Sequence, residues 1–159
     1  VGVDVAGSPS SIDVGPPRTA IVGQVVPLVA PETVRVKGRL YRFVSWSDRG
    51  PRIHSIIAPT SDTTYVAEYQ RSRHKVVFVT RPQGLRLKVE GEDRRSGYGR
   101  AYDEGSVVKV TAPKRQWREG VLYEFVRWSD GGRRSHLVVV PETDLRVRAV
   151  YRRIGTRQT

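Results

Sequence analysis

The feature that most constrains this chain is an internal repeat. Residues 38–69 and residues 120–151 share one sequence pattern at a constant offset of 82 positions, without a gap. Two copies of one pattern fold as two copies of one structural unit, so each copy has about half of the 159 residues in which to bury a core. We therefore predict two small domains. The matched residues are Gly38/Gly120, Tyr41/Tyr123, Phe43/Phe125, Trp46-Ser47-Asp48/Trp128-Ser129-Asp130, His54/His136, Pro59/Pro141 and Tyr69/Tyr151.

The two copies begin differently. An apolar run at residues 76–79 opens the second copy ahead of the alternating segment 85–89, whereas residues 1–5 match only the later segment in pattern. We therefore expect the first copy to lack its N-terminal strand, which would lie upstream or be supplied by another chain. The predicted boundaries are a first repeat at 1–70, a short charged linker at 71–75, a second repeat at 76–153 and a tail at 154–159.

Both copies are predicted to consist of strands. Short segments rich in β-branched and aromatic residues are separated by Gly, Pro, Ser and Asp, and no stretch has apolar residues at helical spacing for three turns. The expected fold is all-β, with two tandem small antiparallel domains of the β-sandwich or β-grasp-like type. Residues 145–152 alternate most clearly, which predicts Arg146, Arg148 and Arg152 on the face opposite the core.

Composition limits the chemistry and the partners. The chain has no cysteine, which removes disulfides, thiol catalysis and thiolate metal sites, and it has no apolar run long enough to insert into a membrane. The net charge of +12 is uneven, because residues 1–70 carry 7 basic and 6 acidic side chains while residues 71–159 carry 21 and 10. A surface this basic favours acidic polymers such as anionic polysaccharide, teichoic acid or nucleic acid. The alternative is the solvated, arginine-rich surface of a protein from a thermophile or a GC-rich genome.

A serine, an aspartate and a histidine recur close together in each copy. A hydrolytic triad needs the histidine hydrogen-bonded to the serine and oriented by the acid, but Ser47 and Asp48 are adjacent and would point to opposite faces of a strand. We interpret the aspartate as the cap of a Gly-rich turn and the histidine as its partner across the hairpin. No catalytic residue, metal site or cofactor is predicted. The structural motif comprises Trp46, Asp48, His54, Trp128, Asp130 and His136.

Aromatic residues without a counterpart in the other copy are better candidates for a ligand site. The matched aromatics are expected in the core, whereas the second copy has three unmatched ones in arginine-rich segments. Aromatic rings beside guanidinium groups can stack on sugars or bases while the arginines hold acidic groups. The alternative is that these rings cover the edge of a small core. The candidate ligand-binding residues are Tyr98, Tyr102, Trp117, Arg100, Arg115 and Arg118.

The repeated motif also carries a family resemblance. Tyr-x-Phe-x-x-Trp-Ser-Asp-Gly-Gly, a following Ser-His and a strand that ends in Ala-x-Tyr resemble the repeat at the C-terminal ends of many secreted actinobacterial proteins, among them sugar dehydrogenases of the glucose/sorbosone type and glycosidases. The motif is more distantly similar to the divergent internalin-type B-repeats of bacterial surface proteins. This resemblance implies an extracellular accessory module without chemistry of its own.

Three functions are compatible with these observations. The first is a non-catalytic module that tethers or spaces a secreted or cell-surface protein and binds polysaccharide through its second repeat, and this is the one we favour. The second is an assembly unit that forms homo-oligomers or filaments through open strand edges. The third is non-specific binding of acidic polymers, with nucleic acid the less expected partner because no nucleic-acid-binding motif is present.

Overall fold

The computed structural model describes residues 1–158, and their regular structure is strand only. The chain divides into two compact units, Val1–Ser72 and a second unit that begins at Arg73. The predicted all-β fold with two tandem domains is confirmed. Residues 1–158 contain no helix long and apolar enough to cross a membrane.

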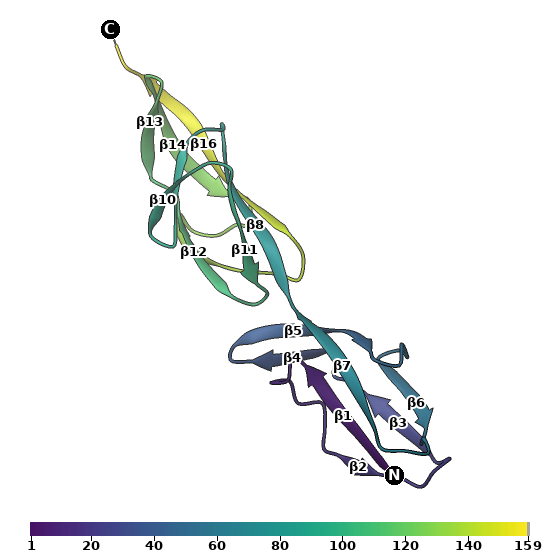
Figure 1. The fold of residues 1–159 in the computed structure, drawn as a ribbon. Helices are drawn as coiled ribbons and strands as arrows, with labels where there is room; N and C mark the ends of the chain where they lie inside the picture. Colours follow the sequence, from purple (N-terminus) through teal and green to yellow (C-terminus); the bar gives the residue numbers. More distant parts are fainter. Residues whose placement is uncertain (159) are drawn as a thin grey trace. The chain divides into compact units, whose positions relative to one another are not determined.

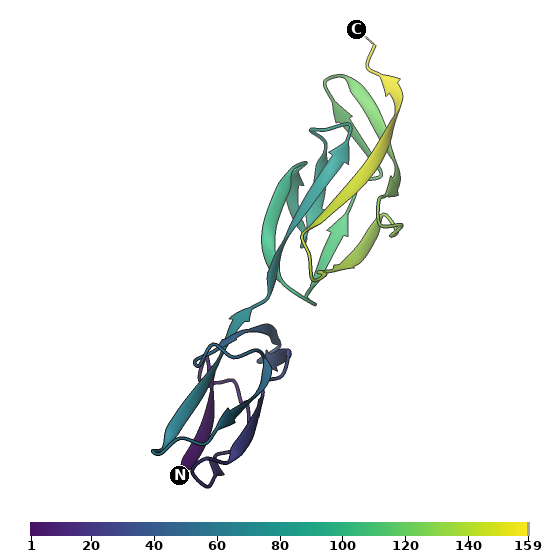
Figure 2. The ribbon, with the colours of Figure 1, turned by 90° about the vertical axis from the view of Figure 1, so that its right-hand side faces the viewer.

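The second unit is a sandwich of two sheets (Figure 1). Its larger sheet has the order β11-β8-β16-β14-β13 and its smaller sheet the order β10-β9-β12-β15. Most neighbours are antiparallel, but β8 and β16 run parallel, and Figure 2 shows them side by side as well. The strands are β8 (Arg73–Arg81), β9 (Arg86–Val89), β10 (Glu92–Arg95), β11 (Tyr98–Asp103), β12 (Val107–Thr111), β13 (Arg115–Arg118), β14 (Val121–Trp128), β15 (Ser135–Val139) and β16 (Leu145–Thr156).

The first unit repeats this plan with fewer strands. A five-stranded sheet with the order β2-β1-β7-β5-β4 is accompanied by a sheet of only two strands, β3 and β6. As in the second unit, the first strand is parallel to the last, here β1 to β7. The strands are β1 (Gly2–Ser8), β2 (Arg18–Thr19), β3 (Val25–Val29), β4 (Thr33–Val36), β5 (Arg39–Trp46), β6 (Ile53–Ile57) and β7 (Thr63–Arg71).

The matched aromatics form the same cluster in both units. The Phe43 ring lies 5.8 Å from that of Tyr69 in the first unit, and Phe125 lies 5.8 Å from Tyr151 in the second. Each phenylalanine also contacts the motif tryptophan, with 6.2 Å between ring centroids in both units. The tryptophans and tyrosines of both clusters are at most 5% exposed. Edge-on and tilted aromatic contacts of this kind fix the ring positions beyond what burial alone would do.

The expected loss of the first strand in the first copy is wrong. Val3 pairs with Thr63, and Val76 pairs with Leu145, the residue 82 positions after Thr63. Strands β1 and β8 are therefore equivalent at an offset of 73 residues, nine fewer than the offset of 82 in the rest of the repeat. The nine residues that the first copy lacks come later, where the second copy has the hairpin of β9 and β10. Alternation of period two is common to all half-buried strands, so it cannot reveal which strand is which.

The predicted linker and tail mostly belong to strands. The division of the chain falls within residues 71–75, but β7 ends at Arg71 and β8 begins at Arg73, which leaves a single residue between them. Residues 73–75 pair with β11, and β16 continues to Thr156 beside β14. Charged side chains do not prevent strand formation here because strand residues can point to solvent.

Candidate functional site

The repeated motif residues hold the turn that follows β5 and β14. In the first unit the Trp46 indole donates a hydrogen bond to the Arg52 carbonyl at 2.9 Å, and Asp48 accepts one from the Gly50 N–H at 2.9 Å. The His54 Nε2 lies 2.7 Å from the Asp48 carboxylate and its Nδ1 2.7 Å from the Pro51 carbonyl. Both neighbours are acceptors, so the imidazole satisfies both bonds only with a proton on each nitrogen.

The same contacts recur in the second unit. Trp128 donates to the Arg134 carbonyl at 3.0 Å, Asp130 accepts from Gly132 at 2.9 Å, and His136 lies 2.7 Å from Asp130. The imidazoles also lie close to Gly50 and Gly132, where a Cβ atom would be within 2.6 Å of the ring. The motif therefore positions a loop that joins the two sheets of each unit.

The motif serine has a separate role. The Ser47 hydroxyl accepts a hydrogen bond from the Val66 N–H at 2.9 Å, whereas both nitrogens of the His54 ring face Asp48 and Pro51. The three side chains are thus not arranged as a nucleophile, base and orienting acid.

The charge state of the turn follows from its contacts. Burial raises the pKa of the Asp48 carboxyl, but hydrogen bonds from the Gly50 N–H and from His54 outweigh it, and the net pKa lies below the usual value. Within residues 1–158, no three His, Asp or Glu side chains gather where they could hold a metal ion.

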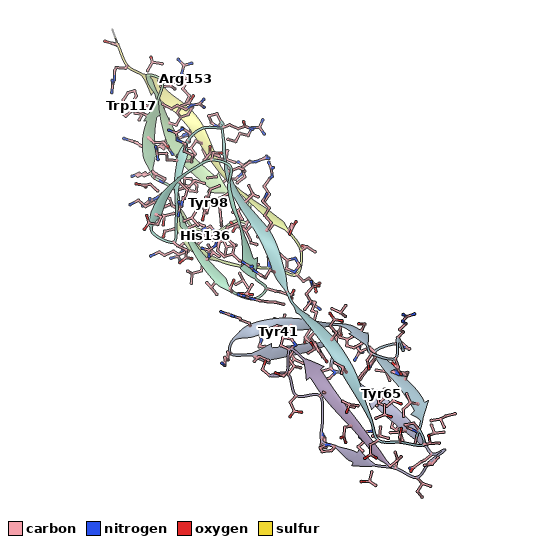
Figure 3. All side chains as sticks on the ribbon, viewed as in Figure 1. Tyr41, Tyr65, Tyr98, Trp117, His136 and Arg153 are labelled. Atoms are coloured by element: carbon pink, nitrogen blue, oxygen red, sulfur yellow. The ribbon has the colours of Figure 1, made fainter. Side chains whose placement is uncertain are left out.

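The predicted aromatic site is not assembled. Tyr98 and Tyr102 lie on β11 and Trp117 lies on β13, and these strands form opposite edges of the five-stranded sheet. Four strand spacings separate them, which is about 19 Å. Figure 3 shows Tyr98 and Trp117 well apart. The tyrosines are half-buried against the core, and only Trp117 is substantially exposed, at 49%.

Each arginine predicted for that site is engaged locally. Arg100 lies over the Tyr102 ring with 5.4 Å to the centroid. Arg115 forms an ion pair with Glu124 at 3.0 Å, and Arg118 donates a hydrogen bond to the Gln83 carbonyl. These six residues therefore cover sheet edges rather than form one surface.

A different set of arginines lies together on the outer face of the same sheet. Val147, Ala149 and Tyr151 of β16 are buried, so Arg146 and Arg148 point away from the core, as the alternation predicts. Parallel pairing places Arg146 opposite Val77 of β8, Arg148 opposite Val79 and Val150 opposite Arg81. We call Arg81, Arg146 and Arg148 the arginine face.

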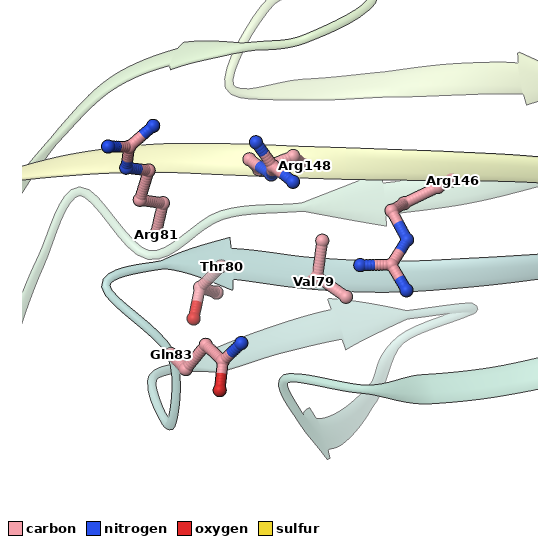
Figure 4. Close-up of a pocket in the computed structure, with 6 residues that line it drawn as sticks. All are labelled: Val79, Thr80, Arg81, Gln83, Arg146 and Arg148. Atoms are coloured by element: carbon pink, nitrogen blue, oxygen red, sulfur yellow. The ribbon is translucent and has the colours of Figure 1, made fainter.

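The arginine face borders a shallow cavity. A volume of about 350 Å³ is lined by Val79, Thr80 and Gln83 together with the three arginines (Figure 4). Successive outward side chains of a strand are about 6.6 Å apart, so the guanidinium groups form a short row that a chain of negative charges can follow.

The charges of the arginine face are not neutralised within the unit. Among residues 1–158, no carboxylate forms an ion pair with Arg81, Arg146 or Arg148. The acidic residue on the neighbouring strand β14, Glu124, is already bound by Arg115 and by Arg152, the latter at 2.7 Å. Hydrogen bonds from these two arginines lower the pKa of Glu124, so it stays ionised and paired with them.

The first unit shows that this fold does not require the arginine face. At the equivalent positions β7 carries Thr64 and Val66 in place of Arg146 and Arg148, and β1 carries Ser8 in place of Arg81. At these three positions the sheet thus carries neutral side chains in one unit and cationic ones in the other.

Sequence reasoning identified two of the three residues of the arginine face and missed Arg81. The alternation in residues 145–152 placed two of its arginines on an outer surface. Arg81 joins them only through the parallel pairing of β8 with β16, two strands separated by most of the second unit. No local pattern in the sequence signals that contact.

Comparisons with known proteins give little further guidance. No family model and no curated protein matches the chain. One solved structure, described as Streptococcal High Identity Repeats in Tandem (SHIRT) domains 3-4 from a cell surface protein, aligns over 96% of this chain and 98% of that one. The identity is 10% and the TM-score 0.33. A likeness at this level carries no conclusion about function.

Proposed function

We propose that this chain is a non-catalytic module of a secreted or cell-surface protein and that it binds an acidic polysaccharide through the arginine face of the second unit. The proposal rests on a contrast between equivalent positions of the two units. Arg81, Arg146 and Arg148 have no carboxylate partner among residues 1–158, whereas the first unit has uncharged residues at these sites. Unpaired guanidinium groups in a row attract anionic polymers and bind carboxylates in a bidentate manner.

Two further observations support this function. The residues of the repeated motif are occupied in holding the turn, which leaves them no part in a reaction. The secreted or surface location rests on the sequence motif, which resembles that of extracellular accessory repeats. An acidic polymer would also offset the excess positive charge of residues 71–159, which carry 21 basic and 10 acidic side chains.

Binding to polygalacturonate tests the proposal. The double variant Arg146→Thr/Arg148→Val takes the residues of the first unit, so it should keep its fold. Affinity for an anionic polymer falls with salt, and each arginine contact contributes about 0.7 to 0.9 to the steepness of log affinity against log salt. The slope of the double variant should therefore be shallower by about 1.4 to 1.8. Neutral hydroxyethylcellulose should bind neither protein.

A charge-matched control separates the site from net charge. Arg95→Thr/Arg133→Val removes the same charge from exposed positions on β10 and on the turn before β15. This control should keep nearly full affinity. If both double variants lose affinity equally, the interaction is non-specific attraction to a basic protein, and the proposed site is wrong.

A further inference from the structure

The first unit carries an uncharged surface where the second unit is charged. Residues 21–29 and 53–58 include no Asp, Glu, Lys or Arg, although at the 28% average of the chain about four of these 15 residues would be charged. Six of their apolar side chains are exposed, while Val26, Leu28 and Ala58 face the core. We call this surface the apolar face: Ile21 (79% exposed), Val22 (53%), Val25 (64%), Val29 (51%), Ile53 (57%) and Ile57 (69%).

Strand pairing makes the apolar face continuous. Val25 lies opposite Ile57 and Val29 opposite Ile53 on the outer side of the two-stranded sheet, while Leu28 faces the core. Contiguous exposed apolar surface of this kind usually marks a contact with another molecule.

The second unit keeps only part of the apolar face, because Val107 and Val139 are exposed at the positions of Val25 and Ile57. Asp103 and Glu104 occupy the positions equivalent to Ile21 and Val22, and Lys109 occupies the position of Pro27. There the hairpin of β9 and β10 widens the sheet, with Lys88 opposite Thr111.

One edge of the two-stranded sheet is closed to further pairing. In the second unit the backbone of Lys109 faces the hairpin, because its carbonyl accepts a hydrogen bond from the Glu90 N–H at 2.8 Å. Its counterpart Pro27 has no N–H to offer a new strand, and the Pro27 carbonyl accepts a hydrogen bond from Arg18 at 2.8 Å. Proline and a covering arginine are common means of protecting an edge strand.

The other edge, that of β6, is open. Ala58 donates to the Gln24 carbonyl at 2.7 Å and Ala30 donates to the Arg52 carbonyl at 3.2 Å, so the even-numbered residues of β6 face β3. The N–H and C=O groups of Ile53, Ser55 and Ile57 then point outward. Within residues 1–158, no strand pairs with this edge.

The sequence of β6 is suited to pairing with itself. A two-fold axis at Ser55 would place Ile53 of one copy opposite Ile57 of the other and join the two sheets in the order β3-β6-β6-β3. Residues 1–70 carry 7 basic and 6 acidic side chains, so two first units repel each other only weakly. Second units, with their large excess of arginine, would repel strongly.

We propose that two copies of this chain associate through antiparallel pairing of their β6 strands, which joins their apolar faces into one surface. The partner is a second copy because β6 is self-complementary and has no Asp, Glu, Lys or Arg, and because the opposite edge of its sheet is protected. This inference is independent of polysaccharide binding, which involves the second unit.

Sedimentation velocity of the whole chain from 1 µM to 1 mM tests the proposal. The chain should pass from monomer to dimer within this range, and Ile57→Lys should weaken the dimer at least tenfold. Val139→Lys is the matched control, because Val139 is the counterpart of Ile57 in the second unit and is 61% exposed. A chain that stays monomeric up to 1 mM, or equal effects of the two lysines, would overturn the proposal.

Cross-linking tests the register separately. Directly opposed residues of a hydrogen-bonded antiparallel pair have Cα atoms about 5.5 Å apart, within the range of a disulfide. Because the chain has no native cysteine, Ser55→Cys should form a covalent dimer on mild oxidation, while Leu137→Cys at the equivalent site of the second unit should not. Equal yields from the two variants would rule out the β6 pairing.

Discussion

Deprotonation of Tyr151 should destabilise the second unit at high pH. The Tyr151 side chain is 5% exposed, and its hydroxyl donates a hydrogen bond to the Pro113 carbonyl at 2.7 Å. Burial raises the pKa of Tyr151 to about 12, although the neighbouring Gln116 and Arg134 act to lower it. A phenolate at this place would lose its hydration and its role as donor.

The sign and size of the effect follow from this pKa. The unfolded chain loses the proton near pH 10, its ordinary value, whereas the folded chain keeps it until about pH 12. Between these values the folded state binds more protons, so stability falls as the pH rises. The contribution is fully present below pH 10. Two pH units at 1.36 kcal/mol each amount to about 2.7 kcal/mol, most of which is lost by pH 12.

Urea unfolding at pH 9 and pH 12 measures this loss. A Trp46→Phe background leaves Trp117 and Trp128, both in the second unit, as fluorescent reporters. At pH 9 the variant Tyr151→Phe should be less stable by about 1 to 3 kcal/mol, because the Pro113 carbonyl loses its donor. The other tyrosines and the lysines titrate in both proteins, so their effects cancel. If the difference between the two proteins stays the same at pH 12, the reasoning about Tyr151 is refuted.

Three other outcomes follow from the structure. Trp128→Ala should cost about 3 to 5 kcal/mol in urea unfolding, while Trp117→Ala, at a half-exposed edge, should cost less than about 1 kcal/mol. The Asp48 carboxylate stabilises the folded state above its usual pKa, and this stability is lost as the pH falls through the lowered pKa of the folded state. The unfolding temperature should therefore drop less between pH 5 and pH 2 for Asp48→Asn than for the unchanged protein. Glu124→Gln releases Arg152 and should strengthen polygalacturonate binding, and an unchanged affinity would show that Arg152 lies outside the site.

The wrong assignment of the first strand shows where sequence reasoning fails. Val1–Val5 alternates like the segment 85–89, and only the pairing of Val3 with Thr63 identifies its strand as the counterpart of β8. The predicted aromatic site failed for a related reason. Tyr98 and Trp117 flank arginines in the sequence, but the order of strands in the sheet places them at opposite edges.

The sequence by itself determined the duplication, the all-β fold and the buried aromatic cluster. Each of these depends on local pattern or on comparison of the chain with itself. Because the copies match, Trp46 packs on Phe43 as Trp128 packs on Phe125. Only the tertiary structure decided which side chains share a surface. Arg81 lies beside Arg146 and Arg148, and Val25 lies opposite Ile57, because strands distant in the chain pair with each other. The free energy of strand pairing depends on the residues of the opposite strand, which no local segment of the sequence contains.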